Sequence, residues 1–344
     1  MSETVLVTGI SGFIAKHVAL ALLDKGYQVR GTVRSSSRQE EVRAAMAEQG
    51  QDLDRLHFVQ VDLTSDEGWD EALRGVGFVQ HLASPFPMAQ PKDRFALVPE
   101  AREGTLRVLN AAAREDVKRV VVTSSVAAMI YRPDRPTRFP IREADWTDVE
   151  WEPLSPYVVS KTKAEEGVWE WAEARGWKDR VAVVNPGLVL GPLLDEESST
   201  SVDVVKLLLE GAYPASPPVA FAVVDVRDVA ELHVAAMTAP ETPGRRLLAA
   251  SDTLGMAEMG QILRSAYPEM AKQIPVRTLP AFLIRFASRF DANLKAVLPD
   301  LSVRPEAENA YVTELTGVSF RLAREALLAS AASLLTHGLV KPKT

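Results

Sequence analysis

The chain has 344 residues, a formal net charge of −7, 47% hydrophobic residues and no cysteine. The length allows one large domain or two moderate ones, and the composition is that of an ordinary globular protein. The acidic balance argues against a nucleic-acid-binding surface, and the missing cysteine excludes disulfides, thiolate metal sites and a cysteine nucleophile.

The first residues, MSETVLVTGI, lack the cationic start and long apolar core of a signal peptide. No apolar run in the sequence reaches the ~20 residues needed to cross a bilayer. We therefore expect a cytoplasmic protein with no membrane partner. The chain enters its first predicted strand almost at once, at residues 4–9.

The first 190 residues alternate short apolar strands with amphipathic helices. Strands are predicted at residues 4–9, 28–34, 56–63, 77–84, 117–125 and 180–187, and helices at 13–27, 38–49, 66–75, 100–115 and after Tyr157. Helices of this size between strands imply parallel pairing, because each crossover returns the chain to the same edge. The sequence predicts an α/β fold with a doubly wound parallel sheet of the Rossmann type in residues 1–190.

The pattern changes after residue 186. Residues 191–201 and 214–218 read as loops, residues 221–237 as a strand running into a helix, and residues 280–290 and 322–335 as helices. The remainder lacks the strand-helix rhythm. We expect residues 191–344 to form a smaller, mainly helical portion that covers the substrate, with residues 220–240 returning to the first domain.

The first strand-to-helix turn, TGISGFIA, places Gly9, Gly12 and Ala15 on a G-x-x-G-x-x-A spacing. The first glycine allows a tight turn, the second lets backbone amides approach a pyrophosphate, and the small third residue lets helix and strand pack closely. A glycine-rich turn without a ligand is the alternative, but the position in the first βα unit favours a dinucleotide. The cofactor-binding residues predicted here are Gly9, Ser11, Gly12, Phe13 and Ile14.

The end of the second predicted strand decides which dinucleotide is expected. An acid there would bind the ribose hydroxyl of NAD, but the segment VRGTVRSSSR has no acid before Glu40 and carries Arg34 and Arg38. A guanidinium can bind a 2′-phosphate through two hydrogen bonds. The sequence therefore predicts NADP(H) with Arg34 as the phosphate ligand, the alternative being two solvated surface arginines.

Three further strand ends lie at the edge of the sheet where such ligands bind. An aspartate and the next amide after the third strand commonly face an adenine, although an aspartate there is also an ordinary helix cap. The residues predicted to contact the cofactor at these strand ends are Asp62, Leu63, Leu82, Ala83, Ser84 and Thr123.

A candidate acid–base pair follows in SPYVVSK. Ser155 can cap a helix whose first residue is Pro156, so Tyr157 and Lys161 fall in its opening turns. A spacing of four puts both side chains on one face, ~5–6 Å apart at Cβ. Between the fifth strand and this helix the chain is rich in proline and arginine and reads as irregular.

The chemistry of carbonyl reduction suits these residues. A phenol with a pKa near ~10 is a poor acid or base at neutral pH, and a fixed ammonium is expected to lower that pKa. A serine hydroxyl at the end of the fifth strand, where Ser124 and Ser125 lie, can orient the substrate carbonyl. Tyr157 can then deliver a proton to the carbonyl oxygen while a nicotinamide supplies hydride, and Lys161 could also hold the nicotinamide ribose.

The motifs VTGISGFIA, VDL, VTSS, YVVSK, NPGLVLGP and VVDVRDVAELH together resemble an extended short-chain dehydrogenase/reductase. The resemblance is to the branch of dihydroflavonol 4-reductase, cinnamoyl-CoA reductase and related aldehyde and ketone reductases, and it spans Thr4 to Met237. It implies a catalytic Ser125, Tyr157 and Lys161. It also implies a 2′-phosphate ligand at Arg34 and a nicotinamide-facing segment formed by Pro186, Gly187 and Leu188.

Two positions depart from the family pattern. Ala15 stands where glycine is usual, and Ile130 stands where the plant flavonoid reductases have an asparagine that meets substrate hydroxyls. A dihydroflavonol is therefore disfavoured against a less polar aldehyde, ketone or β-keto ester. The side chains expected to contact the substrate are Phe86, Ile130, Tyr213 and Phe221.

The sequence thus predicts an NADPH-dependent reductase of a small carbonyl compound, reversible as an alcohol dehydrogenase, acting as a monomer or homodimer. The alternatives are an NAD-dependent nucleotide-sugar epimerase or dehydratase and a non-catalytic NADP-sensing protein. The five histidines show no metal-ligand spacing, so no metal is expected. Asp225, in VVDVRDVAE, is expected to cap a helix, with a substrate contact as the alternative.

Overall fold

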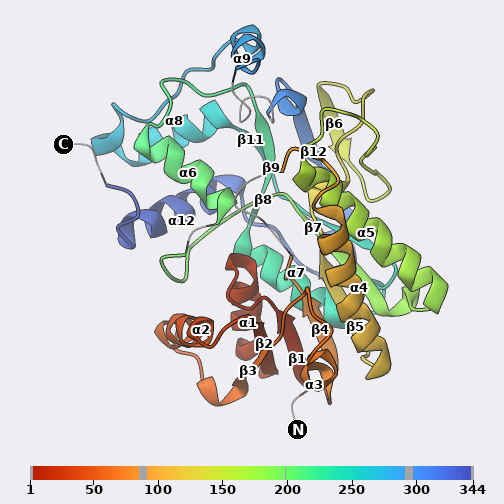
Figure 1. Cartoon of the computed structure of the whole chain (residues 1–344). Coiled ribbons are helices and arrows are strands. Elements are labelled where there is room, and N and C mark those ends of the chain that lie inside the picture. Colours follow the sequence, from red (N-terminus) through yellow and green to blue (C-terminus); the bar gives the residue numbers. More distant parts are fainter. Residues whose placement is uncertain (1–2, 85–90, 198, 291–296, 342–344) are drawn as a thin grey trace.

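A computed structural model of the chain describes residues 3–84, 91–197, 199–290 and 297–341. Its centre is a seven-stranded parallel sheet in the order β10-β7-β5-β4-β1-β2-β3, with helices on both faces (Figure 1). The strands are β1 (Thr4–Thr8), β2 (Gln28–Val33), β3 (Leu56–Gln60), β4 (Phe78–His81), β5 (Arg119–Thr123), β7 (Val181–Pro186) and β10 (Arg246–Ala249). The expected α/β, doubly wound sheet is confirmed.

Both faces of the sheet are buried, as a parallel sheet requires. In β1, Val5 and Val7 enter one hydrophobic cluster while Leu6 enters the other, because successive side chains point to opposite faces. The first cluster is covered by α1 (Phe13–Asp24), α2 (Ser37–Glu48) and α7 (Val226–Thr238). The second is covered by α3 (Trp69–Leu73), α4 (Val98–Arg114) and α5 (Pro156–Arg175).

The smaller portion has its own core. A three-stranded sheet in the order β11-β9-β8 packs with α6, α8 and α12, which lie together at the left of Figure 1. These elements are β8 (Leu188–Leu190), α6 (Thr200–Glu210), β9 (Ala220–Asp225), β11 (Thr253–Gly255), α8 (Met256–Ala266) and α12 (Ala323–Thr336). In the part of the chain that the structure describes, the other α-helices are α9 (Ala281–Ala287) and α11 (Ala310–Thr316).

Two features differ from the sequence expectations. The seventh sheet strand, β10, lies in the segment where no further strands were expected, and it pairs with β7. A second strand, β6 (Arg138–Ile141), falls in the stretch expected to be irregular and pairs in parallel with β12 (Arg304–Ala307). Both strands have four residues, and, unlike the equally short β4, neither falls in the regular alternation of strands and helices that predicted the others.

Helix-terminal expectations are confirmed at two places. Ser155 caps α5 by accepting a hydrogen bond from the Val158 amide, with Pro156 as the first helical residue. Asp225 caps α7 by accepting a hydrogen bond from the Arg227 amide.

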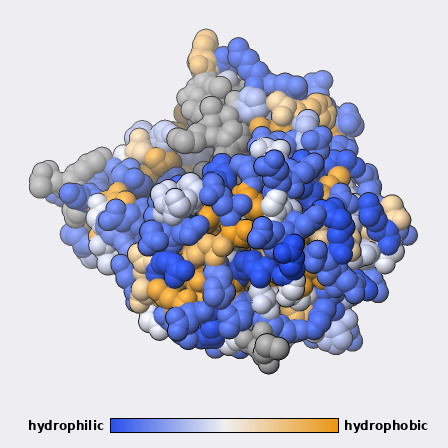
Figure 2. Space-filling view, turned by 60° about the horizontal axis from the view of Figure 1, so that its bottom comes forward, coloured by the Kyte–Doolittle hydropathy of each residue, from blue (hydrophilic) through white to orange (hydrophobic). Residues whose placement is uncertain are grey.

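Hydrophilic residues cover most of the face in Figure 2, with hydrophobic residues in smaller groups between them. Among the described residues, no helix is both long and apolar enough to span a membrane.

Candidate active site

The first βα turn has the shape expected of a phosphate-binding turn. Gly9 has φ +63°, and its amide donates to Thr32 Oγ1 at 2.9 Å. A Cβ on Gly9 would lie 3.0 Å from the Cβ of Ala83, so the turn needs glycine both for its backbone and for space. Gly12 precedes α1, and no side chain caps the helix there. The first amides of α1 are therefore free of side-chain caps, as binding of a phosphate by a helix terminus requires.

A cavity of about 260 Å³, here called the turn cavity, begins at this turn and crosses the carboxyl ends of the sheet strands. It brings together many of the predicted cofactor residues, which lie far apart in the sequence. Those that line it are Gly9, Gly12, Phe13, Ile14, Leu82, Ser84, Thr123, Pro186 and Gly187, together with Ser125, Tyr157 and Lys161.

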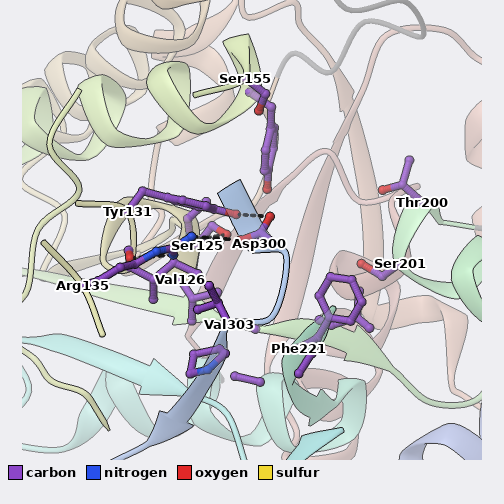
Figure 3. A pocket seen from close by; sticks show the side chains of 18 residues that line it. Ser125, Val126, Tyr131, Arg135, Ser155, Thr200, Ser201, Phe221, Asp300 and Val303 are labelled. Carbon is purple, nitrogen blue, oxygen red and sulfur yellow. Dashed lines mark hydrogen bonds and ion pairs between the residues drawn. The ribbon is translucent and has the colours of Figure 1, made fainter. Parts of the chain in front are cut away.

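A second cavity of about 400 Å³, here called the side cavity, adjoins the turn cavity. Five residues line both cavities, namely Ser125, Tyr157, Gly187, Thr200 and Ser201. The side cavity is otherwise mainly apolar, with Val126, Ile130, Leu188, Phe221 and Val303 among its lining residues (Figure 3). The predicted catalytic serine and tyrosine therefore stand where the two cavities meet.

The ionisation of the predicted pair is set chiefly by burial. Burial raises the pKa of Tyr157 above 10.0, while a hydrogen bond with Ser125 acts to lower it. Burial also lowers the pKa of Lys161 to about 8, against the opposing effect of the Glu165 carboxylate. The expected net lowering of the Tyr157 pKa by Lys161 is therefore wrong for the protein itself, because desolvation of the phenolate is the larger effect.

A buried polar network lies beneath these residues. The Glu165 carboxylate, one helical turn after Lys161, accepts hydrogen bonds from Ser124 Oγ at 2.5 Å and from Asn185 Nδ2 at 2.7 Å. Asn185 also donates to the carbonyl oxygen of Ser125, at 3.2 Å. Arg246 of β10 completes the network with a 2.5 Å bond from its Nε to Glu165 Oε1. The network ties the end of β5 to α5 and β7, and so fixes the backbone of Ser125.

Sequence reasoning missed this network, although Glu165 follows Lys161 at the helical spacing of four and could have been placed on the same face. Arg246 gave no signal, because its role depends on the unpredicted strand β10. Also missed were Ser199, Thr200 and Ser201 at the start of α6, which line the turn cavity. The sequence pattern that could have placed them is a serine N-cap, Ser199, followed by a segment whose apolar residues recur at helical spacing.

The predicted adenosine contacts lie outside the lining of the turn cavity. Arg34 is exposed at the end of β2. Two hydrogen bonds from Thr64 are the main cause that lowers the pKa of Asp62, and the charge of Arg34 adds to this effect, so Arg34 lies near Asp62. Leu63 is half-buried beside Gly104, and Ser11 is half-buried in the first turn. These positions remain predictions for the cofactor.

The predicted substrate contacts divide into three groups. Ile130 and Phe221 line the side cavity, as does Leu188, which was predicted to face the cofactor. Tyr213 does not line it, since its side chain lies in the loop after α6 and is 56% exposed. Phe86 lies outside the described residues. Among the residues that the structure describes, no group of three or more histidine and acidic side chains could hold a metal ion.

Comparison with known proteins identifies the family. Residues 5–249 match the family described as "NAD dependent epimerase/dehydratase family". The chain belongs to this family. Its relatives include tetraketide alpha-pyrone reductase 2 of Arabidopsis thaliana, 34% identical over 78% of this chain and 84% of the relative. Cinnamoyl-CoA reductase 1 of the same plant is 36% identical over 78% of this chain and 76% of the relative. The expected resemblance to extended short-chain dehydrogenases/reductases is confirmed.

Solved structures share the whole architecture of this family member. Yeast methylglyoxal/isovaleraldehyde reductase Gre2, crystallised with NADPH, superimposes with a TM-score of 0.78 at 26% identity, covering 98% of this chain and 100% of Gre2. Gre2 of Candida albicans, also in complex with NADPH, gives a TM-score of 0.79 at 25% identity, covering 97% of this chain and 99% of the other. The likeness extends through the C-terminal portion, where the sequence motifs are weak.

Proposed function

We propose that the protein is an NADPH-dependent oxidoreductase that reduces the carbonyl of a small aldehyde or ketone and runs in reverse as an alcohol dehydrogenase. The observation that carries this proposal is the position of Ser125 and Tyr157, which line both the turn cavity and the side cavity. A group bound in one cavity can react there with a group bound in the other. The relatives named as reductases and the neighbours crystallised with NADPH support the same reaction.

The residues present fit a dinucleotide phosphate. The turn at Gly9 leaves no room for a side chain against Ala83, so the backbone is open where a pyrophosphate would approach. The segment after β2 offers Arg34 and no acid before Glu40, which favours the 2′-phosphate of NADP(H) over the free hydroxyl of NAD. When bound, NADPH supplies the hydride.

The protein's own groups supply orientation and the proton. Ser125 and Tyr157 both face the side cavity, where their hydroxyls would hold the carbonyl oxygen of the substrate by hydrogen bonds. Tyr157 then donates its proton to that oxygen. Its raised pKa keeps the phenol protonated throughout the neutral range, which suits a proton donor. Lys161, charged below a pKa of about 8, favours the phenolate left after donation.

The decisive experiment compares the wild type with Tyr157→Phe while NADPH oxidation is followed with a panel of aromatic and aliphatic aldehydes and ketones. The variant should lose reduction by at least about 100-fold, the usual contribution of general acid catalysis, and should bind NADPH nearly as well as the wild type. Full activity in Tyr157→Phe would show that the proton donor is misassigned. Turnover of a nucleotide sugar without oxidation of NADPH by any carbonyl would favour an epimerase, and binding without any turnover would favour a sensor.

The division between residues 1–190 and 191–344, a cytoplasmic location and a monomeric or homodimeric state remain predictions that belong to this proposal. A small-molecule carbonyl or alcohol is the expected partner.

A further inference from the structure

One wall of the side cavity carries charge. Tyr131, Arg135 and Asp300 all line the cavity, although Asp300 is distant from the other two in sequence. The Tyr131 hydroxyl donates to Asp300 Oδ2 at 3.1 Å, and Arg135 Nη2 lies 3.4 Å from Asp300 Oδ1. Figure 3 shows this cluster on the opposite side of the cavity from Phe221.

The Asp300 carboxylate retains hydrogen-bonding capacity. A carboxylate has about four acceptor positions, and the two bonds from Tyr131 and Arg135 occupy two of them. Its side chain keeps 23% of its surface exposed, and Asp300 is a lining residue of the cavity. Burial raises the pKa of this carboxyl while Arg135 and Tyr131 act to lower it, so its charge is partly compensated. A donor in the cavity would meet the open acceptor positions.

Arg135 is less suited to bind a ligand. Its Nη1 donates to the carbonyl oxygen of Ile130 at 2.9 Å and its Nη2 to that of Pro299 at 2.5 Å. Its guanidinium also lies over the Tyr131 ring, 4.7 Å from the centroid, and only 4% of the side chain is exposed. These contacts fix Arg135 as a support for Asp300, so the wall presents an acceptor of hydrogen bonds and not a site for an anion.

The charged wall belongs to the same cavity as the proton donor. Tyr131 and Tyr157 pack against one small hydrophobic cluster. Burial raises the pKa of Tyr131, the nearby charge of Asp300 adds to this effect, and the charge of an ionised Tyr157 would contribute least. The space between is bounded by apolar side chains such as Val126, Ile130 and Phe221. A substrate here would have an apolar body with a carbonyl at Tyr157 and a different group at Asp300.

We propose that Asp300 determines substrate specificity by accepting a hydrogen bond from a hydroxyl group of the substrate, separated from the reacting carbonyl by an apolar body. This inference rests on the proposed carbonyl reduction. The inference names the substrate class as hydroxylated aldehydes or ketones. The apolar Ile130 by itself had suggested only a less polar aldehyde, ketone or β-keto ester. A substrate that lacks the hydroxyl leaves the half-buried carboxylate without that partner, and the lost hydrogen bond lowers kcat/KM.

The test uses pairs of aryl aldehydes that differ only in a para hydroxyl or a para methyl group, with zero, one or two methylenes between ring and carbonyl. In the wild type, the hydroxyl compound should exceed its methyl partner in kcat/KM by about tenfold at one spacer length or more. Asp300→Leu, which removes both acceptors at similar size, should bring that ratio to about one. Asp300→Asn, which keeps a neutral acceptor, should give an intermediate ratio.

Asp134→Asn serves as the matched control, because Asp134 lies in the same loop as Arg135 and its side chain is 84% exposed. It should keep the wild-type ratio. Equal turnover of both partners at every spacer length, or an unchanged ratio in both Asp300 variants that fold, would overturn the role of Asp300 while leaving carbonyl reduction intact. A preference for a para carboxylate would overturn it in favour of Arg135. No oxidation of NADPH by any of these compounds would overturn the proposed function itself, and this inference with it. If neither Asp300 variant folds, equal turnover of both partners by the wild type still overturns the role of Asp300.

Discussion

Replacing Arg246 with methionine should lower the free energy of unfolding by about 3–5 kcal/mol, the usual effect of breaking a buried ion pair from one side. Arg246 and Glu165 are 2.5 Å apart, with 7% and 0% of their side chains exposed. The variant leaves the Glu165 carboxylate with only the neutral donors of Ser124, Asn185 and Trp169. It also removes the partner of the Glu143 carbonyl oxygen, to which Arg246 Nη1 donates at 2.9 Å.

The double variant separates the ion pair from other effects. Glu165→Gln alone leaves the Arg246 guanidinium buried without its counter-charge and should cost about as much as the first change. With both changes neither member of the pair is left without its partner, and the loss of the Glu165 charge beside Lys161 is common to both proteins that carry Glu165→Gln. The combined loss should therefore be smaller than the sum of the single losses by at least about 2 kcal/mol. Urea denaturation followed by circular dichroism measures all four proteins of this cycle.

The surface pair Arg114–Asp70 provides a matched control. Its atoms also lie 2.5 Å apart, but the two side chains are 55% and 61% exposed. Arg114→Met should therefore cost no more than about 1 kcal/mol. Additive losses in the Glu165–Arg246 cycle, or an Arg246→Met loss no larger than that of Arg114→Met, would refute the reasoning, since the exposed pair has the same separation of its charged atoms.

Four other expectations follow from the structure. The kcat/KM for NADPH reports the protonation state of the free protein, and it should fall by about tenfold per pH unit above about 8 as Lys161 loses its proton. The Lys161→Arg variant should lack this fall. If the fall persists in the variant, Lys161 is not its cause. The buried imidazole of His233 has a pKa of about 3 against 6.5 when free. The unfolded chain therefore binds one more proton at this residue, and the free energy of unfolding should decrease by about 2 kcal/mol from this group as the pH falls from 7 to 5. In urea denaturation, the unfolding free energy of His233→Gln should depend less steeply on pH than that of the wild type. An equally steep pH dependence would contradict the lowered pKa of His233. Gly9→Ala should cost about 1–2 kcal/mol from its φ of +63° and weaken NADPH in fluorescence titration, whereas unchanged binding would speak against a phosphate at this turn. Arg34→Ala should raise the Kd of NADPH more than that of NADH, and equal losses would remove its phosphate role.

The parts of the fold that the sequence predicted are those with a local cause. The strands from β1 to β5 and β7 each carry a run of apolar residues between polar turns, and Ser155 and Pro156 mark the start of α5. Such patterns depend on neighbours in the chain, so they can be read without knowing the tertiary structure. The chain order of these elements was enough to place Tyr157 at the sheet edge beside Ser125.

The parts that the sequence did not predict depend on distant contacts. The strand β10 has only four residues and is recognisable only because it pairs with β7. The pairing of β6 with β12 joins residues 138–141 to residues 304–307, and no local pattern specifies such a partner. Asp300 lies close to that second strand, in a region without motifs, so its approach to Tyr131 could not be foreseen.

The net effect on the Tyr157 pKa shows the same limit at the level of one atom. A lysine at the helical spacing of four is readable from the sequence and argues for a lower pKa. The depth at which the phenol is buried is not readable, and in the structure burial is the larger effect. Proximity of charges can be inferred from spacing, whereas desolvation requires the surrounding elements to be placed.

The two halves of the site are supported in different ways, and this has a consequence for substrate choice. Ser125 is fixed by a buried network from β7, α5 and β10, so its geometry follows from the sheet. The wall around Asp300 comes from a 3₁₀ turn at Leu298–Asp300 and the loop bearing Arg135, outside the seven-stranded sheet. Changes in these loops can therefore alter which compound fits the side cavity while the proposed proton donor stays in place.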